Sequence, residues 1–214
     1  MKVISTNVGK PTSFEWQGKT EETGIFKFPV AEPVFLGSTQ VSKDTISDPK
    51  HHGGTFKACY MFSSTYYPYW EERYPSLDWD WGMFGENITV DNMEETELII
   101  GSVYSLGNAR VQITIPREPC YKLGVRFQDQ GIIKAFVDHG HPGTYVRVLK
   151  EGTVHKGDVF LLQDQANHGV SVSDLYKVLY SKEKDQDLLH ILQGLEAIPQ
   201  RTRKKLGRYI KKGP

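Results

Sequence analysis

Short apolar segments separated by turn-forming residues recur through the first 165 residues of the chain. Most of them are rich in β-branched or aromatic side chains, which is typical of β-strands. Gly107 and Asn108, which lie between two such segments, predict a hairpin turn. Because the segments do not alternate regularly with helices, they favour a barrel or a sandwich. The expected strands are Val34–Leu36, Lys57–Phe62, Asn87–Val90, Ser102–Leu106, Ala109–Thr114, Gly143–Leu149 and Asp158–Leu162.

Helical patterns occur at two places in this region, Ser64–Arg73 and Gly131–Val137, and become dominant after Gln165. There the apolar residues recur at the spacing of one helix face, and Ser171 or Ser173 is available as a first N-cap. The expected C-terminal helices are Val170–Tyr180, Asp185–Leu195 and Pro199–Lys211. The sequence therefore predicts a mainly β domain over residues 1–165 and a small three-helix domain over residues 166–214, packed onto it.

Composition fits a soluble globular protein, because hydrophobic residues make up 38% and charged residues 24% of the chain. The N-terminal residues lack the apolar run of a signal peptide, and no stretch approaches the length of a membrane span. The two cysteines, Cys59 and Cys120, are too few for a disulfide framework or an all-cysteine zinc site. We therefore expect a cytoplasmic protein without a membrane partner.

The formal net charge of the chain is zero, so the balance alone does not call for nucleic acid as the main partner. The charge is unevenly distributed, however. Residues 199–214 contain seven basic and no acidic residues, which leaves a net charge of −7 on the rest. This basic run is interpreted first as a solvated helix face and second as a surface that contacts phosphates.

The segment Ile115–Leu123, with the sequence IPREPCYKL, places Cys120 in a loop that follows an expected strand. Two prolines restrict its backbone and remove two amide donors. Arg117 and Lys122 bring positive charge near the thiol and favour the thiolate. A rigid loop that holds a thiolate suits a soft metal. A lone cysteine is also commonly a small buried apolar residue, so the residues alone leave both interpretations open.

Two glycines and two histidines lie together in the segment Asp48–Gly54. Gly53 and Gly54 allow a backbone concavity whose amides bind phosphate. The side chains of His51 and His52 diverge and no third ligand is spaced nearby, which argues against zinc. The alternative is a polar turn before a strand.

The segment Gly82–Thr89 combines a tight bend at Gly85 with an acid and an amide, Glu86 and Asn87, beside a strand. The alternative is a β-turn that satisfies its own backbone. The overlapping stretch Tyr60–Phe84 is dense in aromatic residues. We interpret it first as core that extends into a loop and second as the wall of a pocket for a flat ligand.

Four motifs follow one another in a specific order. They are HHGG with Lys57, Ala58 and Tyr60, then GENIT at Gly85–Thr89, then PREPCYKL at Pro116–Leu123, and finally GTYVRVLKEGTVHKGD at 143–158. Each is loose alone, but together and in this order they resemble the YiiM-type MOSC-domain proteins over nearly the whole chain. The C-terminal helices resemble the small three-helix domain that follows the MOSC barrel in that branch.

The resemblance implies a MOSC-type β-barrel that binds a molybdenum–pyranopterin cofactor, with Cys120 as metal ligand and catalytic residue. It implies the reduction of N-hydroxylated compounds, such as hydroxylaminopurines, to amines. Electrons would come from a separate reductase. The sequence leaves open whether the chain forms a homodimer. The other residues assigned to the cofactor are His51, His52, Gly53, Gly54, Lys57, Asn87, Thr89, Arg117 and Lys122.

Three positions depart from the family pattern. Ile115 stands where glutamine is frequent, Phe56 where an acid is usual, and Cys59 where an aliphatic residue is common. Strand alternation makes Cys59 a core residue. These changes leave Cys120 in place but leave substrate choice and the finer cofactor contacts open. The second interpretation is a carrier of molybdenum cofactor or sulfur, and the third is a nucleic-acid-binding module built on the basic C-terminal run.

Overall fold

The computed structural model describes residues 1–47 and 53–211. Its largest element is a mixed sheet of eight strands in the order β12-β8-β9-β10-β6-β7-β1-β4. Strands β6 and β7 are parallel, and the other neighbours are antiparallel. The strands are β1 (Val3–Gly9), β4 (Lys27–Pro29), β6 (Cys59–Ser63), β7 (Ile88–Val90), β8 (Val103–Leu106), β9 (Ala109–Pro116), β10 (Thr144–Lys150) and β12 (Leu161–Asp164).

The large sheet does not close into a barrel, which corrects the expected architecture: in the described ranges no ladder joins β12 to β4. An isolated bridge between Lys2 and Val159 brings the segment before β12 alongside the start of β1. The edge strand β4 is only three residues long and ends at Pro29, which has no N–H for a further ladder. Two smaller antiparallel sheets, β2 (Thr12–Trp16) with β3 (Lys19–Thr23) and β5 (Val34–Leu36) with β11 (Gly152–Val154), complete the β structure.

All seven expected strands are present, but only Val34–Leu36 has the expected bounds; the ends of the other six are shifted by one to three residues. The expected strand Lys57–Phe62 begins only at Cys59, because Thr55–Lys57 forms the short 3-10 helix η1. Strands β1 to β4 and β11 were missed by the sequence pattern. In β1 the reason is visible, since Ser5, Thr6 and Asn7 are polar yet buried and therefore hide the alternation of a strand.

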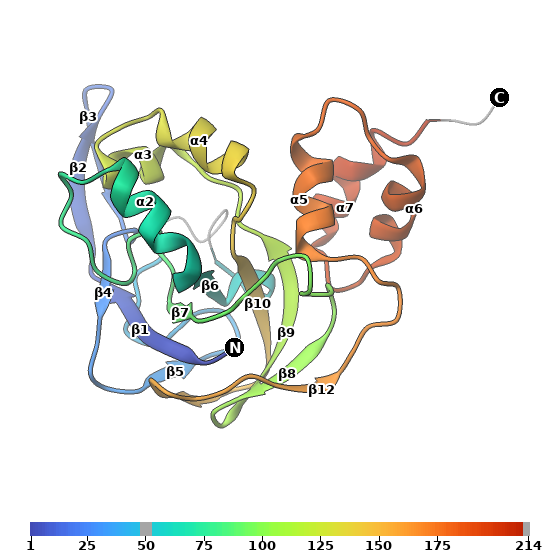
Figure 1. Cartoon of the computed structure of the whole chain (residues 1–214), viewed down its shortest axis with the longest axis horizontal. Helices are drawn as coiled ribbons and strands as arrows, with labels where there is room; N and C mark the ends of the chain where they lie inside the picture. The colour runs from blue at the N-terminus through green and yellow to red at the C-terminus, as the bar shows by residue number, and fades with distance from the viewer. Residues whose placement is uncertain (48–52, 212–214) are drawn as a thin grey trace.

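Three helices, α2 (Tyr67–Arg73), α3 (Tyr121–Phe127) and α4 (Ile132–His139), lie together at one end of the sheet (Figure 1). Between them and the sheet is an aromatic core. The rings of Phe62 and Phe84 stack with 4.2 Å between centroids, and Trp70 and Phe136 are fully buried beside them. The interpretation of the stretch Tyr60–Phe84 as core is confirmed for Phe62, Trp70 and Phe84. Helix α3 was not expected from the sequence.

The C-terminal helices α5 (Val172–Tyr180), α6 (Gln186–Gly194) and α7 (Gln200–Gly207) form a group beside β8 and β9 (Figure 1). Ser171 caps α5 by accepting from the amide of Asp174 at 3.1 Å, while Asp174 bonds back to Ser171. Ser171 also forms an isolated β-bridge with Ile99. The start of the helical group is therefore fixed to the β structure. Across the described residues, no helix is long and apolar enough to cross a membrane.

Candidate functional site

Cys120 lies at the wall of a cavity of about 600 Å³, including its part open to solvent. Strand β9 ends at Pro116, a short loop follows, and Cys120 takes the N-cap position of α3 with an extended backbone. The side chain is partly exposed rather than sealed in the core. The cavity is lined by Thr23, Gly24, Ile25, Lys27, Asp44, Thr45, Ile46, Ser47, Lys57, Ala58, Tyr60, Gly85, Asn87, Arg117, Cys120, Lys122 and Tyr145.

The charge of the lining is strongly positive. Four cations, Lys27, Lys57, Arg117 and Lys122, face one carboxylate, that of Asp44. Confined positive charge with low-dielectric walls attracts anions. The lining therefore favours a ligand that carries negative charge.

Among the described residues, Arg117 has a side-chain donor that no protein acceptor meets. Its side chain is only 6% exposed, and the guanidinium group lies over the ring of Tyr60 at 5.0 Å. Its Nη1 atom is buried and has no hydrogen-bond partner within the described part of the chain. A buried donor without an acceptor costs free energy, so an anionic ligand in the cavity would stabilise this arrangement.

Lys57 and Lys122 approach the cavity from different elements. Lys57 ends η1 and lies over the ring of Tyr145, 5.3 Å from its centroid. Burial lowers the pKa of Lys57; Glu118 opposes this effect, and the nearby charges of Arg201 and Arg117 add to it. Lys122, in the first turn of α3, donates to the carbonyl of Glu22 at 2.9 Å and to Ser47 Oγ at 3.1 Å.

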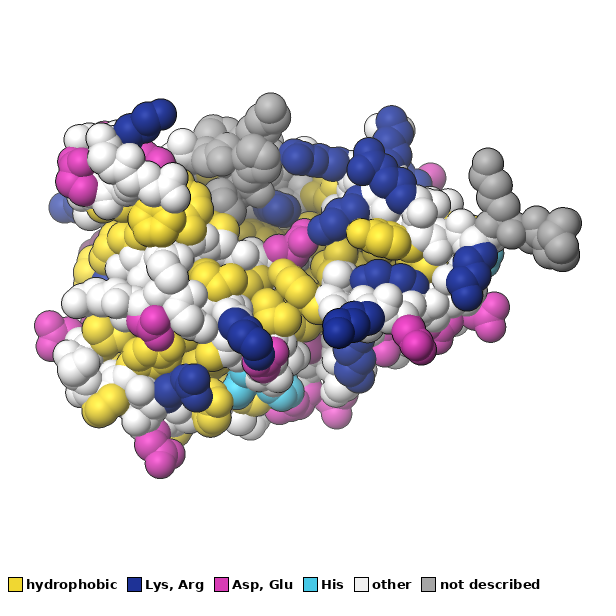
Figure 2. All heavy atoms as spheres, turned by 90° about the horizontal axis from the view of Figure 1, so that it is seen from above, with side chains coloured by type: hydrophobic (Ala, Val, Ile, Leu, Met, Phe, Trp, Pro, Cys, Tyr) yellow, Lys and Arg dark blue, Asp and Glu magenta, His cyan; other side chains and the backbone are white. Residues whose placement is uncertain are grey.

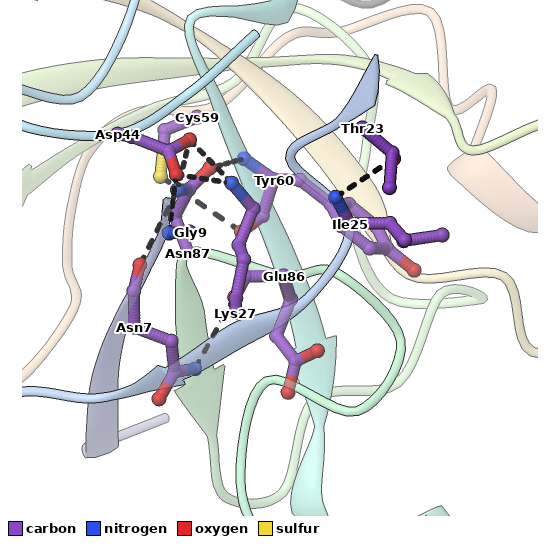
Figure 3. Close-up of polar contacts among 10 residues, drawn as sticks. All are labelled: Asn7, Gly9, Thr23, Ile25, Lys27, Asp44, Cys59, Tyr60, Glu86 and Asn87. Carbon is purple, nitrogen blue, oxygen red and sulfur yellow. Dashed lines mark hydrogen bonds and ion pairs between the residues drawn. The ribbon is translucent and has the colours of Figure 1, made fainter. Parts of the chain in front are cut away.

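An ion pair between Lys27 and Asp44 forms one side of the cavity (Figure 3). Asp44 also accepts from the amide of Gly9 at 2.8 Å and from Asn87 Nδ2 at 2.9 Å. Burial lowers the pKa of Lys27, and Asp44 opposes that shift. Asn87 in turn accepts from the amide of Tyr60 at 3.3 Å, so the network joins five separate segments of the chain.

Five of the residues expected at the site come together at this cavity: Lys57, Asn87, Arg117, Cys120 and Lys122. Gly53 and Gly54 are not among the lining residues. Gly54 has φ +88°, its amide bonds the carbonyl of Thr39 at 3.2 Å, and it precedes η1, so it positions Lys57. His51 and His52 lie outside the described residues.

Thr89 is not brought to the cavity. It is fully buried in β7, where its hydroxyl accepts from Asn7 Nδ2 at 3.0 Å and donates to Glu86 Oε1 at 2.8 Å. Glu86 is likewise buried and accepts from the amides of Gly82 and Phe84, as in the alternative of a turn that satisfies its own backbone. Both residues thus stabilise the bend before β7 from inside.

Cys59 is fully buried and does not line the cavity, which agrees with the expectation that it is a core residue. Burial raises the pKa of its thiol. Cys120 is therefore the cysteine at this cavity.

Sequence reasoning missed Lys27, Asp44 and Tyr145 as lining residues, whereas Tyr60, at the start of the aromatic stretch, does line the cavity. Lys27 is a single lysine between Phe26 and Phe28, and this interruption of an apolar run was the available signal for it. Asp44 gave no local signal, because its role arises from contacts with residues distant in the sequence.

The class of this protein is indicated by its mainly β fold and by a thiol that lies after a strand end in a cation-lined cavity. The model of the MOSC domain matches residues 48–160, and the chain belongs to the MOSC-domain family, in its YiiM-type branch. The chain is 37% identical to the uncharacterized protein YflK of Bacillus subtilis (strain 168), over 86% of this chain and 82% of that protein.

Two further similarities bear on function and fold. The chain is 33% identical to a protein of Gibberella moniliformis named "Reductase", over 78% of this chain but only 30% of that protein. The crystal structure of YiiM from Geobacillus stearothermophilus superposes with a TM-score of 0.82 at 29% identity, covering 98% of this chain and 99% of that one.

Proposed function

We propose that this protein is a molybdenum-cofactor-dependent oxidoreductase that reduces N-hydroxylated compounds, such as hydroxylaminopurines, to amines. The observation that carries the proposal is the juxtaposition, in one cavity, of the partly exposed thiol of Cys120 and the buried, unsatisfied Nη1 atom of Arg117. Membership of the MOSC-domain family and the similarity to a relative named "Reductase" support it.

The residues of the cavity fit the cofactor. Cys120 would supply the thiolate ligand that a soft metal prefers. Arg117 and Lys122 would neutralise the phosphate, since cations placed at a phosphate form charge-assisted hydrogen bonds. The rings of Tyr60 and Tyr145, 5.2 Å apart, form an apolar wall of the kind against which a flat pterin packs.

The overall reaction consumes two electrons and two protons: R–NHOH + 2 e⁻ + 2 H⁺ gives R–NH₂ + H₂O. The bound cofactor supplies the chemistry that removes the oxygen of the N–OH group. The chain's own residues orient the cofactor, set the charge of the cavity and hold protons. Lys27 holds a proton at Nζ beside Asp44 at the cavity wall, and its pKa is lowered by burial.

The test begins with expression in a host that makes the cofactor, followed by measurement of molybdenum and pterin per chain. The wild-type protein should contain both and should reduce a hydroxylaminopurine with dithionite as electron source. Cys120→Ser should lose the metal and the activity. The matched control is Cys59→Ala, which removes the other thiol outside the cavity and should keep both.

Two results would change the conclusion. An unchanged molybdenum content in Cys120→Ser would refute the ligand assignment. Metal-loaded wild-type protein that does not turn over with dithionite would instead support the second function, a carrier of the cofactor for another enzyme.

A further inference from the structure

Four exposed cations form a stripe along one face of α7 and its C-cap residue, Arg208. Arg201, Lys204, Lys205 and Arg208 follow the spacing i, i+3, i+4 and i+7, which places them on the same side of a helix. We call these four residues the basic stripe. The opposite side of the helix is anchored by Leu206, which is buried. Figure 2 shows Lys and Arg side chains gathered over this helical group.

The basic stripe is unfavourable for the helix itself. Arg201 and Lys205, like Lys204 and Arg208, are like-charged i, i+4 pairs, which destabilise a helix. Arg201 lies in the first turn, where the helix dipole disfavours a cation, and no acidic residue occupies that turn. The stability of α7 therefore does not explain the stripe, whereas an external anionic surface would offset the repulsion among its cations.

The basic stripe is connected to the Cys120 cavity. Lys205 forms an ion pair with Glu118 at 3.0 Å, and Glu118 lies two residues before Cys120 in the same loop. Arg201 is near enough to Lys57, in the cavity wall, to contribute to the lowering of its pKa, of which burial is the main cause. A partner that covers the stripe would therefore lie beside the loop that carries the proposed metal ligand.

From this placement we infer that the basic stripe is the docking surface for a small acidic electron-carrier protein with a flavin or iron–sulfur centre. The inference rests on the proposed function, which needs two electrons per N–OH group reduced. Each N–OH group reduced consumes two electrons, taken from two carriers that are each oxidised by one electron or from one flavin hydroquinone oxidised by two, and solvent supplies the two protons. Because Lys205 of the stripe pairs with Glu118, a carrier bound to the stripe would hold its redox centre beside the loop that carries Cys120.

An acidic protein fits this surface better than nucleic acid does. The stripe occupies a helix of eight residues, roughly 12 Å long, and the chain outside residues 199–214 carries a net charge of −7. A long polyanion would be repelled beyond this short surface, while a compact acidic patch would match it.

The test compares two charge-reversal variants of the cofactor-loaded full chain. Lys204→Glu/Arg208→Glu reverses half of the basic stripe without touching the Lys205–Glu118 pair. The control, Arg110→Glu/Lys150→Glu, makes the same charge change at the far end of β9 and β10, where these exposed residues are partners in the register. Each variant is assayed with dithionite, and with a reduced acidic flavodoxin or a reduced acidic [2Fe–2S] ferredoxin.

We expect kcat/KM with the carrier proteins to fall tenfold or more in the stripe variant at low ionic strength, and the difference to shrink as salt is added. The dithionite-driven rate should stay the same in both variants, and the control variant should keep its carrier-driven rate. An unchanged carrier-driven rate in the stripe variant, or an equal loss in the control, would overturn the inference.

A separate readout distinguishes failure of the docking surface from failure of the proposed function. Should wild-type protein fail to turn over even with dithionite, the proposed function is wrong, and binding of the oxidised carriers to the unloaded chain is measured by NMR titration. Binding that is lost only in the stripe variant supports the surface. Absence of binding, or tighter binding of a single-stranded oligonucleotide, overturns it.

Discussion

The guanidinium group of Arg117 lies over the ring of Tyr60, with 5.0 Å between Cζ and the ring centroid. Both side chains are buried, and both line the cavity that contains Cys120. The ring holds the cation in place by a cation–π contact but offers no acceptor to the Nη1 atom. Arg117 is thus positioned in advance for an anion that the described residues do not provide.

Replacement of Arg117 by methionine should weaken cofactor binding while leaving the stability of the unloaded protein nearly unchanged. The change removes a buried charge and an unsatisfied donor but also a cation–π contact, so the unfolding free energy of the unloaded protein should stay within about 1 kcal/mol of wild type. The molybdenum content should fall at least tenfold. Arg126→Met is the matched control, because Arg126 also stacks on aromatic rings but does not line the cavity; equal losses in both would refute the role of Arg117.

The two cysteines should differ sharply in reactivity. Iodoacetamide should alkylate the partly exposed Cys120 in the native, unloaded protein, while Cys59 should react only after unfolding because it is fully buried and burial raises its pKa. Peptide mass spectrometry locates the modification. Loading with the cofactor should protect Cys120, and fast native alkylation of Cys59 would contradict the described packing.

Lys27→Met should destabilise the protein by about 3 kcal/mol or more, because it leaves the buried carboxylate of Asp44 without its cation. Urea unfolding measures the loss. The double variant Lys27→Met/Asp44→Asn should recover part of it, since the unpaired charge is gone. The matched control is Lys134→Met at the exposed Lys134–Asp138 pair, where a change below about 0.5 kcal/mol is expected; an equal effect at both sites would contradict the burial of the first pair.

His139 should make stability depend on pH. Burial lowers its pKa from 6.5 to about 4, and His141 adds to the shift. Below pH 6.5 the unfolded chain binds a proton that the folded chain does not, so stability should fall as the pH drops from 6.5 to about 4. His139→Gln should flatten this part of the pH profile of Tm.

The control for this prediction is His190→Gln, which removes an exposed histidine of α6. It should leave the pH profile unchanged. A profile that is equally steep in wild type and His139→Gln would show that other groups dominate acid destabilisation.

The fold could be predicted from the sequence where apolar periodicity is unbroken. Strands β7 to β10 and helices α5 to α7 follow regular patterns, and Ser171 is a recognisable cap. Strand β1 could not be found this way, because its polar residues are buried and Asn7 is satisfied by Glu86 and Thr89, far away in the sequence. The open sheet was missed for a similar reason, since closure depends on long-range pairing at strands only three or four residues long.

The site was predictable to the extent that its chemistry is local. Cys120, Arg117 and Lys122 lie within one loop and the following helix turn, so their proximity follows from the chain itself. Lys27 and Asp44 join them only through tertiary structure. Thr89 shows the converse, because this polar residue of the GENIT motif bonds inward to Asn7 and Glu86.

Ser171 serves two neighbours at once, as the cap of α5 and as the bridge partner of Ile99. Movement of the C-terminal helices about this position would have to break both the cap of α5 and the bridge to Ile99. The C-terminal helices are therefore difficult to transfer to another scaffold, because the segment around Ile99 would have to be transferred with them. Deleting them from Val172 onward would remove the amides of Val172 and Ser173, which donate to the carbonyls of Leu98 and Glu95.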